Sequence, residues 1–174
     1  VTAWRDKGSG LVYALTQDAT TGAIVRSAEA LSSLAATHLC AIAQDGAVLV
    51  LWTDSGGLKG RRLAASSPGS GWGSIVTINS SSAYSGAMAL AACTGPAGTV
   101  NVAVRRAASG TANNQLIYVN TTTLATSSTA TFGTSYTTAS GAFVMAWDSA
   151  HSRVLLLSEE FVGELHAWVY SSTH

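Results

Sequence analysis

The sequence is poor in charge, in proline and in cysteine, and it has no long apolar run. Charged residues make up 10% of its 174 residues, and nine basic residues balance nine acidic ones. A nucleic-acid-binding surface needs a basic excess, so no nucleic-acid partner is expected. Disordered chains combine low hydrophobicity with high net charge, which does not describe a chain that is 47% apolar. Two prolines exclude collagen, and no stretch reaches the roughly 18 strongly apolar residues of a membrane span.

The two cysteines, Cys40 and Cys93, fit neither a metal-binding spacing nor a CxxC motif. Each lies in a run of small apolar residues, which favours buried free thiols. A disulfide between them is the alternative if the chain resides outside the cytosol. The chain begins at Val1 and no signal segment precedes its first strand, as expected for a processed product or an excised piece.

Small residues dominate what is present, with 30 Ala, 23 Ser, 20 Thr and 17 Gly. Short runs of β-branched and aromatic residues alternate with polar and glycine clusters, which is typical of strands joined by turns. Apolar and polar residues alternate within several runs, which favours half-buried antiparallel strands. The best helical candidate is the Ala-rich segment Ser27–Thr37. The clearest predicted strands are Leu11–Thr16, Ala47–Thr53, Thr99–Arg105, Gln115–Asn120, Val154–Ser158 and Leu165–Ser171.

Four segments share one pattern, namely Thr2–Ala28, Cys40–Ser66, Ala89–Thr122 and Met145–Ser171. Each begins with an apolar strand and passes through a polar turn to Leu/Val-rich sequence. A second turn then leads to another strand. The middle two segments are each followed by a further strand candidate, Gly73–Ile78 and Ser128–Phe132. The chain therefore reads as four strand–turn–strand units of three to four strands.

These units resemble the repeats of β-propeller proteins, in which small twisted meanders stack around an axis. No Kelch motif accompanies the pattern, and Thr53–Lys59 resembles a sialidase Asp-box without its closing Trp. We expect an all-β fold of antiparallel meanders in a single domain over residues 1–174, propeller-like with about four blade-like units. A β-sandwich is the alternative. Four blades are the lower limit for a ring, so a part of a larger propeller or assembly is also compatible.

The residues that could carry catalysis have simpler structural explanations. His38 and Ser55 lie in segments that resemble those of chymotrypsin-like proteases, but they are too close in sequence, with only Asp45 and Asp54 between them as acids. The four histidines lack zinc-site spacing. Three carboxylates near the last turn could form a glycosidase pair or a solvated turn cluster, namely Glu159, Glu160 and Glu164. We therefore predict no catalytic residue, no metal and no cofactor.

Three of the four first turns are led by aspartates, Asp6, Asp45 and Asp148. Aspartate side chains accept hydrogen bonds from nearby backbone amides and so favour turns. If the four units stack, the same aspartates would recur at one end and could bind a cation. The turn-forming role and the cation site are the two interpretations.

Trp72 lies in the glycine- and serine-rich stretch GSGWGS, where no strand pattern surrounds it. A loop indole of this kind is a candidate to stack on a sugar ring or to contact a partner. Trp4 and Trp147, by contrast, occupy equivalent positions in the first and last units. Their equivalence predicts packing between units.

Two pairs of adjacent arginines follow central apolar strands, Arg61–Arg62 and Arg105–Arg106. Because neighbours on a strand point to opposite faces, one arginine of each pair should point outward and the other toward an interface. They are explained either as edge charge with an ion pair to a neighbouring unit, or as contacts to an anionic glycan. The predicted glycan or partner contacts are thus Trp72, Arg61, Arg62, Arg105 and Arg106.

The low charge and the Ser/Thr/Ala/Gly surface resemble the composition of phage tail and fibre structural proteins. That resemblance implies a non-enzymatic structural or recognition module of a virion, or of another extracellular assembly. Its partners would be other protein subunits, in a homo- or hetero-oligomer, with surface glycans as a further candidate. Two alternatives remain open: a glycan-binding lectin that uses Trp72 and one arginine pair, and a fragment of a propeller glycosidase.

Overall fold

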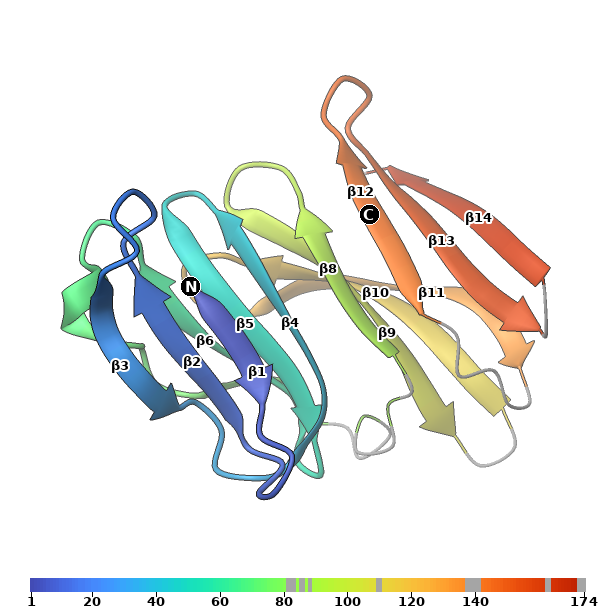
Figure 1. The fold of residues 1–174 in the computed structure, drawn as a ribbon. Helices are drawn as coiled ribbons and strands as arrows, with labels where there is room; N and C mark the ends of the chain where they lie inside the picture. Colours follow the sequence, from blue (N-terminus) through green and yellow to red (C-terminus); the bar gives the residue numbers. More distant parts are fainter. Residues whose placement is uncertain are drawn as a thin grey trace.

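Four antiparallel β-sheets make up the fold (Figure 1). The computed structural model describes residues 1–80, 84, 87, 89–108, 111–136, 142–161 and 164–171. Sheet A contains β1 (Thr2–Arg5), β2 (Val12–Gln17) and β3 (Ile24–Ala30). Sheet B contains β4 (Ala36–Gln44), β5 (Ala47–Asp54), β6 (Gly57–Ala64) and β7 (Val76–Asn79), with the short 3₁₀ helix η1 (Pro68–Ser70) before β7. Sheet C contains β8 (Ala89–Thr94), β9 (Thr99–Ala108), β10 (Thr111–Asn120) and β11 (Thr126–Tyr136), and sheet D contains β12 (Phe143–Asp148), β13 (Arg153–Phe161) and β14 (Glu164–Ser171).

The four sheets coincide with the four repeated segments of the sequence. Each is a meander whose neighbouring strands are consecutive in the chain. All six predicted strands are confirmed, and the two additional candidates correspond to β7 and β11. The all-β, antiparallel-meander expectation is therefore confirmed.

The helix predicted for Ser27–Thr37 is wrong. Its first part belongs to β3, where Ala30 pairs with Tyr13 of β2. The segment then makes tertiary hydrogen bonds instead of helical ones, since the Leu31 amide donates to the Val12 carbonyl oxygen at 2.7 Å. Leu31 itself is buried in the core between sheets A and B. Tertiary pairing and burial therefore override the helix propensity of the alanines.

Alternate residues of the central strands of sheets B and C pack against different neighbouring sheets, as the period-two pattern requires. On β5, Val50 and Trp52 belong to the core shared with sheet A, whereas Leu49 and Leu51 belong to the core shared with sheet C. The strands of sheet C divide their side chains in the same way between sheets B and D. Three cores result, and they join consecutive sheets in the order A, B, C, D.

The first strands of the sheets lie beside one another along one side of the molecule (Figure 1). Strand β4 packs next to β8, and β8 packs next to β12, while β1 lies against β4. The β8 sequence ALAACT contains only small residues apart from Leu90. Such residues let the strands approach closely. Sheets A and D lie at opposite ends of the row, and the described strands do not close into a ring.

Candidate functional site

Trp72 is buried, so the predicted exposed contact at this position is wrong. Its side chain is 8% exposed and packs with Val12, Leu31 and Trp52 between sheets A and B. The glycine- and serine-rich loop folds back on sheet B, where the Gly73 amide donates to the Arg62 carbonyl oxygen at 2.8 Å. Stacking on a sugar ring needs an open indole face, which the core packing removes. Trp72 therefore anchors its loop.

Arg61 is bonded to backbone oxygens around this loop through its three side-chain nitrogens. Its Nε donates to the carbonyl oxygen of Gly73 at 2.6 Å, and its Nη2 donates to that of Trp72 at 3.2 Å. Its Nη1 makes a longer contact of 3.4 Å with the carbonyl oxygen of Ala30 in sheet A. All three nitrogens thus hold parts of the fold together. The prediction of a glycan contact does not fit Arg61.

Arg62 points to the other face of sheet B and lines a pocket of about 360 Å³. Its Nε donates to the carbonyl oxygen of Thr121 at 2.9 Å, and no described residue accepts a hydrogen bond from its Nη atoms. The pocket lies between sheets B and C, bounded by the loop after β6 and the turn between β10 and β11. Its other lining residues are Ala64, Ser70, Gly71, Gly73, Ser74, Val76, Thr122, Thr123 and Leu124.

This pocket is the best candidate for a binding site because it combines a guanidinium with hydroxyl groups. Serine and threonine hydroxyls both donate and accept hydrogen bonds, and a guanidinium pairs with a carboxylate in a forked geometry. Such a lining suits a small, polar, anionic ligand. Of the five predicted contact residues, only Arg62 lines it.

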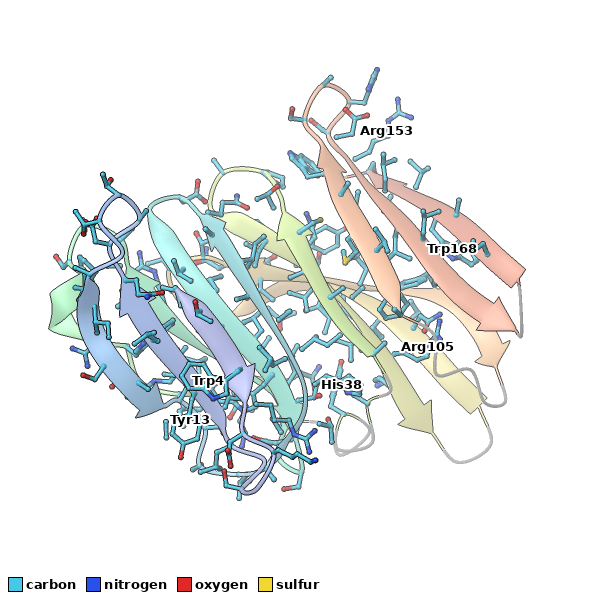
Figure 2. The ribbon with its side chains drawn as sticks, in the orientation of Figure 1. Trp4, Tyr13, His38, Arg105, Arg153 and Trp168 are labelled. Carbon is cyan, nitrogen blue, oxygen red and sulfur yellow. The ribbon has the colours of Figure 1, made fainter. Side chains whose placement is uncertain are left out.

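Arg105 is completely buried, and its predicted glycan contact is wrong. Its Nε donates to Oδ1 of Asn114 at 3.0 Å, and its guanidinium carbon lies 5.0 Å from the centre of the Phe143 ring in sheet D (Figure 2). Arg106 points to the opposite face, where its guanidinium carbon lies 5.6 Å from the centre of the Tyr84 ring. A cation over an aromatic ring is favoured by the ring quadrupole. Both arginines therefore support packing on either side of sheet C.

The turn-forming interpretation is confirmed for Asp6 and Asp148. Oδ2 of Asp6 accepts a hydrogen bond from the Ser9 amide at 2.6 Å, which is the largest cause of a lowered pKa for this carboxyl. Asp148 accepts hydrogen bonds from the amides of Ala150 and His151. The side-chain hydrogen bond with His151 contributes most to the lowered pKa of Asp148.

Asp45 plays a different role, because it connects two sheets. It lies with Gly46 in a two-residue hairpin in which both residues have positive φ, 51° and 67°, as in a type I′ turn. Its Oδ2 accepts a 2.7 Å hydrogen bond from the amide of Gly98, in the β8–β9 turn of sheet C. Among the residues that the structure describes, no three His, Cys, Asp or Glu side chains gather as a metal site would require.

The protease-like residues do not form a catalytic arrangement in the structure. His38 lies within β4 opposite Thr53, whereas Ser55 is exposed at the tip of the β5–β6 hairpin. Burial is the main cause of the lowered pKa of His38, and the nearby charge of Arg5 adds to it. The side chains of the glycosidase candidates Glu159, Glu160 and Glu164 lie outside the described part of the chain.

Both cysteines are free thiols, as predicted. Cys93 is buried in the core between sheets C and D, and Cys40 is packed against the core between sheets B and C. Burial raises the pKa of Cys40 to about 12 and that of Cys93 to about 11. The thiolate is the reactive form of cysteine, so these groups are poor nucleophiles at neutral pH.

The sequence matches no protein-family model, and no curated protein is similar to it. Within the described part of the chain, no helix has the length and hydropathy needed to cross a membrane.

Sequence reasoning missed the hydroxyl-bearing residues of the pocket. Ser70 and Ser74 lie on one loop, and Thr122 and Thr123 lie on a turn of another sheet. Each segment alone is an ordinary polar turn. Arg62 was the residue of this pocket that the sequence pointed to. The two polar segments meet only because sheets B and C pack together, which their local sequences do not reveal.

Proposed function

We propose that this chain is a non-enzymatic structural or recognition module, built as four blades of a propeller-type stack. It would act in a virion tail or fibre, or in another extracellular assembly, with other protein subunits as partners. The observation that carries this proposal is the position of β8 between β4 and β12, while sheet C packs against sheet B on one face and sheet D on the other. Propeller blades are arranged in this way because their first strands crowd toward a common axis.

Further support comes from the polar side chains that connect consecutive sheets. Gln44, at the end of β4, exchanges three hydrogen bonds with the backbone of Gly95 and Pro96 after β8. Asp45 and Arg62 make additional bonds from sheet B to turns of sheet C. These contacts fix the angle between neighbouring sheets. A rigid stack of sheets with few charges keeps its shape as salt changes, which suits a structural part of a particle.

The direct test is an experimental structure of the native assembly that contains this chain. We expect β8 between β4 and β12, with the four sheets arranged as blades around an axis. Two large sheets packed face to face, as in a sandwich, would contradict the propeller. The non-enzymatic part is tested with a broad panel of aryl glycosides, on which no turnover is expected. Turnover that is lost on Glu159→Gln or Glu160→Gln substitution would instead establish a glycosidase.

Binding of an acidic saccharide in the Arg62 pocket is a second candidate function. The specific observation in its favour is the guanidinium of Arg62, whose Nη atoms donate to no described residue and which lines a pocket with four hydroxyl-bearing residues. A sugar carboxylate could pair with the guanidinium, and sugar hydroxyls could bond with the serines and threonines.

This second function is tested by NMR titration with uronic-acid and sialic-acid saccharides. Binding should shift the amide signals of Thr122 and Thr123, and Arg62→Gln should weaken it at least tenfold. Arg5→Gln is the matched control, because Arg5 is exposed on β1 and lies outside the pocket. Equal loss of binding in both variants, or no shift with any saccharide, would remove this candidate.

A further inference from the structure

The two interior sheets bury both of their faces. Sheet B packs through Trp52 against sheet A and through Leu49 against sheet C. Sheet C packs through Val102 against sheet B and through Leu116 against sheet D. We call the face of a sheet that points toward the previous sheet in the chain its preceding face, and the face that points toward the next sheet its following face. Each interface thus joins the following face of one sheet to the preceding face of the next. Sheets A and D are the ends of this series, and each has one face that no other sheet covers.

The outer face of sheet D is apolar and exposed. Along β13, Leu156 is buried against sheet C, whereas its neighbours Leu155 and Leu157 are 42% and 45% exposed. Leu155 pairs with Val169 of β14, and Leu157 pairs with Val144 of β12, so these side chains form adjacent rows on one face. We call this set the leucine face, and it consists of Val144 (64% exposed), Leu155, Leu157, Leu165 (76%) and Val169 (57%).

A group of exposed aliphatic side chains on neighbouring strands can mark an interaction site. Charged positions flank these rows: Arg153 is paired in register with Asp148 at the turn end of β13 (Figure 2), and Glu159 is paired with Leu165 toward its other end. Along β13, large aliphatic residues point to both faces of the sheet. The central strands of sheets B and C have the same pattern, and there both faces are buried.

The outer face of sheet A carries two aromatic rings. Trp4 of β1 and Tyr13 of β2 are paired in register, and their rings are stacked with centres 5.9 Å apart. Val12 and Ala14, on either side of Tyr13, are buried toward sheet B. The rings therefore point away from the rest of the molecule, and Trp4 is 37% exposed (Figure 2). We call Trp4 and Tyr13 the tryptophan face.

The position of Trp4 identifies the kind of surface that should cover it. Trp147 lies at the matching place in sheet D, on the first strand and paired with Val154 of the second strand. Trp147 packs into the core between sheets C and D, against the sheet that precedes its own. Trp4 therefore lies on the preceding face of sheet A, which no earlier sheet covers. The leucine face is the following face of sheet D, which no later sheet covers.

We infer that the leucine face of one copy of this chain docks on the tryptophan face of a second copy. This contact continues the same following-to-preceding packing that joins sheets A, B, C and D within the chain, and it covers both kinds of exposed face at once. It is a head-to-tail contact, which closes into a ring or extends as a filament according to the rotation between copies. The inference rests on the proposed propeller-type stack.

The experiment measures mass by analytical ultracentrifugation from micromolar to millimolar concentration. We expect the wild-type chain to associate into particles of at least two copies. Leu157→Arg on the leucine face and Trp4→Arg on the tryptophan face should each be monomeric when alone. Each variant still keeps one intact face, so an equimolar mixture should form a one-to-one dimer. Ala125→Arg, in the β10–β11 turn, should associate like the wild type.

Other outcomes would overturn the inference. If Trp4→Arg still dimerises alone, the leucine faces of two copies meet each other instead. If the wild-type chain stays monomeric throughout, the two faces are not used between copies, and another polypeptide segment covers them. Circular dichroism and thermal melting of each variant confirm that the fold is intact. A monomeric result leaves the proposed stack of sheets standing, whereas glycoside turnover would contradict the proposed function and leave self-association unaffected.

Discussion

The indole Nε1 of Trp52 donates a 3.1 Å hydrogen bond to Oδ2 of Asp54, two residues further along the chain. Both side chains are buried. The other carboxylate oxygen, Oδ1, accepts a 2.7 Å bond from the Gly56 amide and lies 3.1 Å from Nζ of Lys59. Asp54 therefore holds the β5–β6 hairpin together and accepts the hydrogen bond of the buried Trp52 indole N–H. The resemblance of this segment to an Asp-box reflects a structural role in this chain.

Removal of the Asp54 carboxylate should destabilise the protein strongly. Asp54→Ala leaves the Trp52 N–H and the Lys59 ammonium without their acceptor in a buried environment, which typically costs about 3 kcal/mol. The loss is measured as a lower free energy of unfolding in urea. Asp18→Ala is the matched control, since Asp18 also bonds turn amides but is exposed. An equal loss in the two variants would show that the Trp52–Asp54 bond contributes little.

Gln44 should be important for the angle between sheets B and C. Its side-chain amide donates to the carbonyl oxygens of Gly95 and Pro96, at 3.1 and 2.8 Å, and its Oε1 accepts from the Gly95 amide at 2.8 Å. Gln44→Ala removes all three bonds, and we expect a loss of about 1–3 kcal/mol. Gln44→Glu should be at least as damaging, because it places a carboxylate oxygen opposite the two carbonyl oxygens.

Urea unfolding of these variants measures the effect, with Gln17→Ala as the control. Gln17 makes a single longer bond of 3.5 Å to the carbonyl oxygen of Gly22 within its own hairpin. If Gln44→Glu is as stable as the wild type, the three bonds do not hold the sheets together.

His38 should make the protein less stable as the solution becomes mildly acidic. Its pKa is lowered by burial and by the charge of Arg5, and its Nδ1 has no hydrogen-bond partner among the described residues. The folded protein thus favours the neutral imidazole, and the unfolded chain binds a proton more readily. Stability is therefore unaffected by His38 above its ordinary pKa of about 6.5 and falls as the pH drops below it.

The measurement is the free energy of unfolding between pH 7.5 and pH 5, for the wild type and for His38→Gln. The glutamine variant should lose less stability over this interval than the wild type, because it has no group to protonate at this position. Parallel curves for the two proteins would show that the folded environment does not discriminate against the charged imidazole.

The strands could be predicted from the sequence because their signals are local. The alternation in β5, β9 and β14 reflects which side chains face a core, and Asp45–Gly46 has the residues that a type I′ hairpin needs. The four units were visible for the same reason. The segment Ser27–Thr37 failed because its alanines suit either a helix or a closely packed strand, and only the pairing of Ala30 with Tyr13 decides between them.

The candidate site was largely beyond the reach of the sequence. Burial of Trp72 and Arg105 depends on sheets that lie elsewhere in the chain, so a loop tryptophan and an arginine pair looked accessible when only their neighbours in sequence were known. Arg105 tolerates burial because Asn114 Oδ1 accepts a hydrogen bond from its Nε and because its guanidinium lies over the Phe143 ring. The Arg62 pocket likewise needs Thr122 and Thr123 from a separate sheet.

The two thiols should be nearly inert in the folded protein. Burial raises the pKa of Cys40 to about 12 and that of Cys93 to about 11, although a hydrogen bond with Asn101 works in the opposite direction at Cys93. At pH 8 we expect Ellman's reagent to label both thiols slowly in the native state and rapidly in urea. Because folding favours the neutral thiol, this contribution to stability is complete below about pH 8.5 and is lost as the pH rises toward 11–12. Cys40→Ala and Cys93→Ala variants assign the two labelling rates. Rapid native labelling of Cys93 at pH 8 would mean that sheets C and D separate readily in solution, which contradicts the tight core described between them.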